Sequence, residues 1–122
     1  MQLSIDAAEK QGVSVLGLSG KLVAGEECDT LRAQIRNLLV SDKKSILLNM
    51  GGVTRVDSTG IGMLVESVIY TTKQGGELKL ANLPRLITNI LNTHRLLQAF
   101  DIYTSEDEAL AAFKRPAKEP AA

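Results

Sequence analysis

The chain has 122 residues, which is the length of a single domain. Fourteen Lys and Arg balance fourteen Asp and Glu, and this zero net charge argues against a nucleic-acid binder, which carries a basic excess. A single cysteine, Cys28, excludes an internal disulfide, and a single histidine, His94, excludes a multi-histidine metal centre, so we expect neither a metal nor a cofactor.

The first third of the chain predicts a hairpin followed by a helix. Residues 3–5 and 13–18 have the short, alternating apolar pattern of strands, and Gln11-Gly12 is a plausible turn between them. Residues 20–25 are expected to form a loop. From about 26 to 40 the apolar residues recur at helical spacing, and the acidic residues at the start suit the positive end of a helix. The apolar stripe of this helix is Leu31, Ile35, Leu38 and Leu39.

The middle of the chain predicts a buried strand that leads into a second helix. Residues 45–50 form a short, continuous apolar run, which is typical of a central parallel strand covered on both faces. We expect Gly51-Gly52 to end this strand. A helix is expected from about 58 to 74, with Gly75-Gly76 as its stop signal. Its apolar stripe is Ile61, Leu64, Val65, Val68 and Ile69.

The remainder predicts two further strand–helix units. Residues 77–81 and 100–103 form strands; one helix follows Pro84, and another begins with Ser105 as its cap and Glu108 three residues later. The order β-β-α-β-α-β-α-β-α predicts an α/β fold, a single domain with a mixed, mostly parallel sheet of about five strands and about four helices. We place the domain at residues 1–113. Residues 114–122 contain two prolines and no large apolar side chain, so we expect a flexible tail.

The segment after the central strand, Asp57-Ser58-Thr59-Gly60-Ile61-Gly62, has two interpretations. Asp, Ser and Thr are good helix caps, so capping alone explains the polar residues. However, each glycine in the first turn costs up to about 1 kcal/mol relative to Ala, and it leaves backbone N–H groups open to another molecule. A hydroxyl at a helix start is also a favourable place for phosphate, and phosphorylation adds about 1.5–2 negative charges. The second interpretation is therefore a phosphorylation switch at Ser58.

The same segment resembles the phosphorylation motif of the STAS family, in particular the bacterial anti-sigma factor antagonists. The resemblance covers about residues 3–113 and implies a STAS-like fold. It departs from the family at Val23, because many relatives carry an acidic residue there, after Gly-x-Leu. The supporting matches are residues 46–49, 75–78, 100–103 and 105–110.

This resemblance implies a binding module that is not an enzyme and has no catalytic residue. Such an antagonist binds an anti-sigma factor that is also a serine kinase, and this frees the sigma factor. The kinase phosphorylates the first serine of the motif, here Ser58, the complex dissociates, and a PP2C-type phosphatase restores the free hydroxyl. Asp57 is expected to cap the helix, and Met63, which lies off the apolar stripe, to face outward. The partner-binding residues are then Asp57, Ser58, Thr59, Gly60, Gly62 and Met63.

Other functions remain open on the sequence. A STAS domain can also be a constitutive scaffold subunit of a larger signalling or lipid-transport assembly. A small nucleotide-binding protein is less well supported, because no phosphate-gripping lysine or metal-ligand cluster accompanies Ser58. Self-association is possible. The chain start lacks the pattern of a signal peptide, and no run approaches the roughly 18 apolar residues of a membrane span, so we expect a cytoplasmic protein without a membrane partner. His94 is expected at a helix end or on the surface, and Cys28 to be partly buried.

Overall fold

A five-stranded sheet runs through the computed structural model, which describes residues 3–114. The strands are β1 (Leu3–Lys10), β2 (Val13–Leu22), β3 (Ser45–Val56), β4 (Glu77–Ala81) and β5 (Asp101–Tyr103). They lie in the spatial order β1-β2-β3-β4-β5; β1 pairs antiparallel with β2, and all other neighbours pair in parallel. The helices are α1 (Glu26–Val40), α2 (Ser58–Lys73), α3 (Arg85–Thr93), a short 3₁₀ turn η1 (Leu97–Ala99) and α4 (Glu106–Lys114). The mixed α/β architecture and its element order are confirmed.

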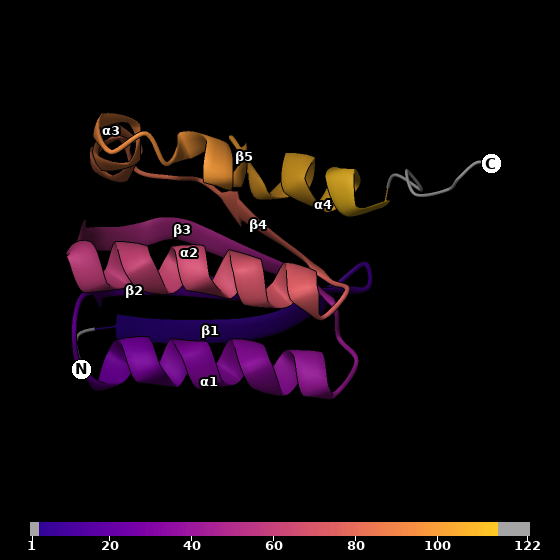
Figure 1. Cartoon of the computed structure of the whole chain (residues 1–122). Coiled ribbons are helices and arrows are strands. Elements are labelled where there is room, and N and C mark those ends of the chain that lie inside the picture. The colour runs from indigo at the N-terminus through magenta and orange to yellow at the C-terminus, as the bar shows by residue number, and fades with distance from the viewer. Residues whose placement is uncertain (1–2, 115–122) are drawn as a thin grey trace.

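The helices form a layer on each side of the sheet. α1 and α2 lie side by side on one face, and α4 lies on the other (Figure 1). In β3, Ile46 and Leu48 belong to the large core under α1 and α2, whereas Leu47 packs with Ala109 and Leu110 of α4. The central strand is therefore covered on both faces along its first half, as its continuous apolar run predicts.

β3 is longer than the sequence suggests, and the expectation that Gly51-Gly52 ends it is wrong. The strand continues to Val56, and its pairing with β2 shifts register between Gly17 and Ser19. A Cβ atom at Gly52 would collide with the Ser19 hydroxyl and would lie 2.8 Å from the Leu18 carbonyl oxygen. The glycine thus lets two strands with an irregular register pass close to each other, and the chain continues from the carboxyl end of β3 to the start of α2.

α2 turns a different side to the core than its apolar stripe suggests. Met63 is only 1% exposed, so the expectation that it faces outward is wrong. Ile69, which the stripe places inside, is 51% exposed. Gly60 lies directly against the Leu22 backbone, and Ser67 and Thr71 are also buried, so the buried side of α2 includes small and polar residues besides the stripe. The buried residues of α2 are Gly60, Ile61, Met63, Leu64, Ser67 and Thr71.

α4 is fastened to the back of the sheet by polar contacts as well as by its apolar side. Glu106 forms an ion pair of 2.6 Å with Lys10 of β1 and accepts a hydrogen bond from Asn49 of β3. The hydrogen bond from Lys10, and to a smaller extent that from Asn49, holds the pKa of Glu106 below its ordinary value. The Lys79 ammonium lies over the rings of Tyr103 and Phe113. Together these contacts join β1, β3 and β4 to the last helix.

The boundaries of α4 differ slightly from expectation. The Ser105 hydroxyl accepts the Glu108 N–H at 3.1 Å, as a cap does, while the Glu108 carboxylate binds Thr104. Lys114, assigned to the tail from the sequence, is the last residue of α4. The remainder of the expected flexible tail, residues 115–122, lies outside the described residues.

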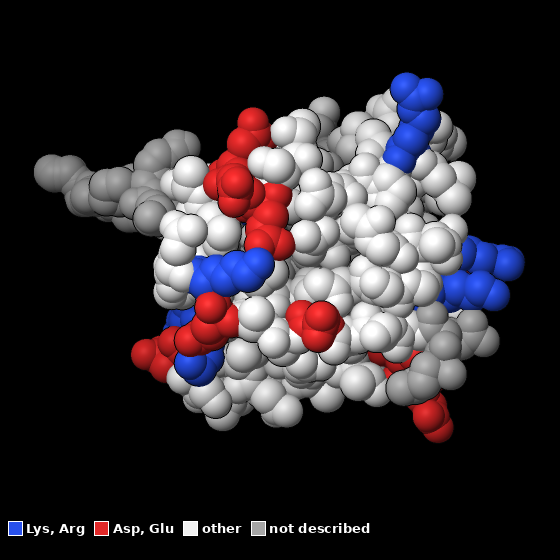
Figure 2. Space-filling view, turned by 180° about the vertical axis from the view of Figure 1, so that it is seen from behind, with Lys and Arg blue, Asp and Glu red and all other residues white. Residues whose placement is uncertain are grey.

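The back of the molecule, where α4 lies, carries few charged side chains (Figure 2). Most of its charged side chains gather toward the two sides of this view and leave the centre largely uncharged, and no continuous basic patch crosses this face. Among residues 3–114, no helix has both the length and the apolar character needed to cross a membrane. The same residues hold no group of three His, Cys, Asp or Glu side chains placed to bind a metal ion.

Replacing Gly52 with alanine is expected to destabilise the fold by about 1–3 kcal/mol, because the added methyl group meets the β2 backbone. Gly17→Ala is the matched control, since its Cβ would lie 3.7 Å from its nearest neighbours, and it should leave stability unchanged or slightly higher. Urea unfolding followed by circular dichroism measures both. Equal stabilities for the two variants would contradict the assigned role of Gly52.

Candidate functional site

Asp57 fixes the start of α2. One carboxylate oxygen accepts the N–H of Gly60 in the first turn, and the other accepts the N–H of Ala24 in the loop after β2, both at 2.9 Å. The predicted cap is therefore confirmed, and it also joins two segments that are distant in sequence. The bonds from Ala24 and then Gly60 hold the pKa of Asp57 below its ordinary value of 3.8. Asp57 is thus ionised at neutral pH.

The Ser58 side chain has no part in this capping. Ser58 is the first residue of α2 and is exposed, as is Thr59 beside it. Within the described part of the chain, the Ser58 hydroxyl has no hydrogen-bond partner. Because Asp57 supplies the cap, the Ser58 hydroxyl is left available to another molecule.

The two glycines of the first turn have different surroundings. Gly60 is buried, and a Cβ there would collide with the Leu22 carbonyl oxygen and lie 2.8 Å from a methyl group of Val56. The expectation that Gly60 opens space for another molecule is therefore wrong, since the protein's own backbone occupies that space. Gly62 is exposed, and a Cβ there would meet no atom within 4 Å. Of the two, only Gly62 presents an uncovered surface.

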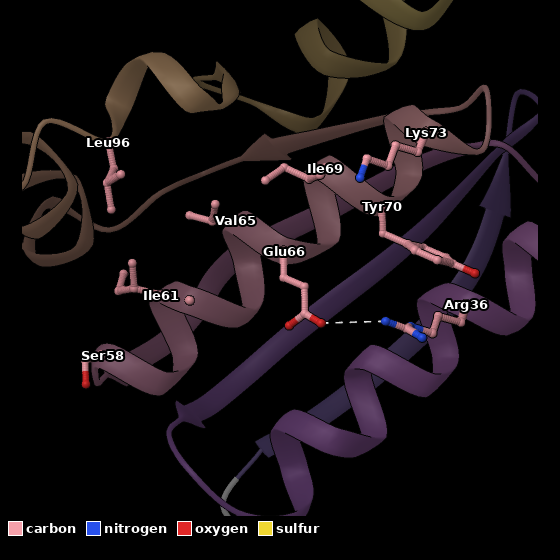
Figure 3. A pocket seen from close by; sticks show the side chains of 10 residues that line it. Arg36, Ser58, Ile61, Val65, Glu66, Ile69, Tyr70, Lys73 and Leu96 are labelled. Carbon is pink, nitrogen blue, oxygen red and sulfur yellow. Dashed lines mark ion pairs between the residues drawn. The ribbon is translucent and has the colours of Figure 1, made fainter.

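A groove of 610 Å³ extends along α2 from Ser58, and we call it the α2 groove. Its apolar wall is built by Ile61, Val65 and Ile69, whose side chains lie toward Leu96 across the groove (Figure 3). Of these three residues of the predicted apolar stripe, Ile69 is exposed and Val65 is half-buried, whereas Ile61 is buried at the groove wall. The residues that line the α2 groove are Arg36, Ser58, Ile61, Gly62, Val65, Glu66, Ile69, Tyr70, Lys73 and Leu96.

Charged side chains border the α2 groove on the side of α1. The Glu66 carboxylate forms ion pairs with Arg32 at 3.4 Å and with Arg36 at 3.6 Å. The Arg36 guanidinium also lies over the Tyr70 ring, 4.4 Å from its centre. Lys73 stands at the end of the groove away from Ser58 (Figure 3). An apolar centre with a polar rim is the usual composition of a protein–protein contact surface, and Tyr and Arg are enriched in such surfaces.

A second cavity, of 290 Å³, joins the start of α2 to the end of α3. Asp57 and Ser58 line it from one element, and His94 and Ile90 from the other. His94 is exposed at the end of α3, as expected, but no pattern in the sequence predicts that it lines the same cavity as Ser58. The two residues are distant in the chain, so local spacing could not reveal this.

The loop after β2, where the sequence departs from the STAS pattern at Val23, contributes to the same site. Ala24 donates its N–H to Asp57, and the Val23 carbonyl accepts a hydrogen bond from the Cys28 thiol. Burial raises the pKa of Cys28, and the nearby Asp57 carboxylate adds to this effect. Cys28 is therefore a buried structural residue and not a reactive thiol.

Comparisons with known proteins agree on one family. A family model for the STAS domain matches residues 4–109. An anti-sigma F factor antagonist of Paenibacillus polymyxa is 25% identical over 111 residues, which cover 90% of this chain and 94% of that protein. A crystal structure of an anti-sigma factor antagonist from Mycobacterium paratuberculosis has a TM-score of 0.80 at 19% identity and covers 92% of this chain and 94% of its own. SpoIIAA, a Bacillus cell fate determinant, was solved in its phosphorylated form; it has a TM-score of 0.71 at 18% identity and covers 90% of this chain and 99% of its own.

Asp57→Asn is expected to lower stability at neutral pH, because an amide cannot accept both backbone N–H groups as the carboxylate does. The folded state lowers the pKa of Asp57, so its stabilising contribution is complete above 3.8 and is lost as the pH falls through the lower folded-state value. Urea unfolding from about pH 7 to about pH 2 should therefore show the difference between wild type and variant shrinking. A difference that is independent of pH, or one shared by the exposed control Asp42→Asn, would contradict this role.

Proposed function

The chain belongs to the STAS domain family, and from that premise we propose that it is an anti-sigma factor antagonist whose docking is switched by phosphorylation of Ser58. It acts as a binding module and kinase substrate and not as an enzyme. Its partners are an anti-sigma factor with serine kinase activity and a PP2C-type phosphatase, both in the cytoplasm. The names of its relatives support the general function. One observation carries the switch: the Ser58 hydroxyl is exposed and unbonded among the described residues, and it lies at the end of an apolar groove.

The position of Ser58 explains how a phosphate releases a partner without unfolding the protein. In the free protein, the positive end of α2 favours the added anion, and Asp57 keeps the helix capped. In a complex, the same phosphate would lie beside the ionised Asp57 and would be covered by a partner on the groove. Removing a doubly charged group from water without a counter-charge is strongly unfavourable. The phosphate therefore opposes docking more than it opposes folding.

The α2 groove is the docking surface that this function needs. Ile61, Val65 and Ile69 supply apolar contact area next to the modified residue, so a partner bound there also covers Ser58. Thr59 and Gly62 are exposed beside it and extend the contact. The role of Gly60 and Met63 is indirect, because both are buried and pack α2 against the sheet.

Ser58→Ala is expected to bind an anti-sigma serine kinase from the same organism constitutively, and the protein with phosphoserine at position 58 to bind it at least about 100-fold more weakly, which corresponds to about 2.8 kcal/mol. Isothermal titration calorimetry measures both affinities. Thr59→Ala is the control, since it removes the adjacent exposed hydroxyl and should leave the switch intact. Mass spectrometry after incubation with kinase and ATP should place the phosphate on Ser58.

Phosphate on another residue, or equal affinities of the phosphorylated and unphosphorylated proteins, would contradict this function. A large assembly in native mass spectrometry that is insensitive to every substitution of Ser58 would favour a constitutive scaffold subunit instead.

A charge placed in the α2 groove should disrupt docking without disturbing the fold. Ile69→Lys is expected to weaken kinase binding by at least about 10-fold, because the substitution places an ammonium group in the apolar contact. Leu86→Lys on α3 is the matched control: Leu86 is 53% exposed, compared with 51% for Ile69, but it does not line the groove. Thermal melts should show both variants folded, and an equal loss of binding in both would contradict the assignment of the groove.

A further inference from the structure

We propose that His94 is the intramolecular partner of the phosphate when Ser58 is phosphorylated. The proposal rests on the proposed function only for the presence of that phosphate. His94 and Ser58 come from different elements and line one cavity of 290 Å³ between the start of α2 and the end of α3. A water molecule occupies about 30 Å³ in the liquid, so the cavity has room for a phosphoryl group and several waters.

The end of α3 determines the position of His94. His94 caps the helix and donates its backbone N–H to the Ile90 carbonyl at 3.2 Å. Arg95 then takes the left-handed conformation, with φ of 59°, and Leu96 donates to the Leu91 carbonyl at 2.7 Å. This tight turn directs the chain back toward α2, so that Leu96 lines both the cavity and the α2 groove. The imidazole is thus carried on a hydrogen-bonded turn, and the His94 side chain is exposed.

Among the residues that line this cavity, His94 alone has a side chain that can become positively charged. Asp57 is the other ionisable group on the cavity, and both of its oxygens already accept backbone N–H groups. The cations of the α2 groove are engaged or distant, since Arg36 contacts Glu66 and Tyr70, and Lys73 lies in the last turn of α2. Of the cation-forming residues that line these two cavities, His94 is therefore the one left to pair with the phosphate.

The pairing makes the released state sensitive to pH. A protonated imidazole donates charge-assisted hydrogen bonds to phosphate, and these are stronger than bonds between neutral groups. Histidine changes its charge in the physiological range, so moderate acidification strengthens the pair. The charged groups near His94 are Asp57, which lines the same cavity, and its exposed chain neighbour Arg95, which does not line it; the residues of η1 are uncharged. We expect acidification to stabilise the phosphorylated protein selectively.

Phosphoserine incorporated at position 58 during translation allows a test without any kinase. A pH titration followed by ³¹P NMR should give the wild-type phosphate a midpoint at least about half a pH unit below that of His94→Gln, because a nearby cation favours the dianion. Arg95→Gln is the matched control: it removes the adjacent charge, which does not line the cavity, and should titrate like wild type. In the same samples, the His94 imidazole should titrate at higher pH with the phosphate than without it.

Identical phosphate midpoints for wild type and His94→Gln would overturn the proposal, as would a shift that disappears in Arg95→Gln instead. Circular dichroism checks that the variants fold. Because the phosphate is installed without a kinase, this result does not depend on whether Ser58 is the natural substrate. A lowered phosphate midpoint in wild type that is lost in His94→Gln supports the His94–phosphate pair, even if kinase incubation leaves Ser58 unmodified. Failure of the kinase to modify Ser58 contradicts only the proposed function.

Discussion

The site depends on one carboxylate that binds two backbone segments. Asp57 accepts an N–H from the first turn of α2 and another from the loop that follows β2. A serine or threonine cap has a single hydroxyl oxygen, whereas the carboxylate has two oxygens and can serve both segments at once. Because Asp57 caps the helix, the Ser58 hydroxyl is not needed to hold the fold. A residue without a structural duty can be modified without loss of the fold.

Close backbone approaches place this carboxylate correctly. Gly52 lets β3 pass beside the bulged β2 strand, and Gly60 lets the first turn of α2 rest against the Leu22 carbonyl. Both glycines are needed because the space for a side chain is occupied by the protein itself. The strand, the loop and the helix consequently meet at the carboxyl ends of β2 and β3, where parallel α/β folds commonly place their functional groups.

Much of the fold follows from local pattern, because strand and helix periods are properties of neighbouring residues. The helix at residues 26–40 and the strand at 77–81 have the predicted boundaries. What the pattern missed are contacts between distant segments. β3 continues past Gly52 because its pairing with β2 shifts register there. The burial of Met63 depends on how α2 packs on the sheet. The neighbourhood of His94 and Ser58 exists only after α3 has folded back toward α2.

α2 has apolar residues on two sides, and this has a consequence for the protein in its unbound state. One side packs in the core, while on the other side Ile69 is exposed to solvent. An exposed apolar surface of this kind promotes self-association and aggregation. Three charged residues border this apolar surface: Arg36, Glu66 and Lys73. A contact that buries the apolar surface must also desolvate these charges or pair them with opposite charges, and this disfavours non-specific association. Under the proposed function, the same few charged side chains would both limit self-association and select a partner.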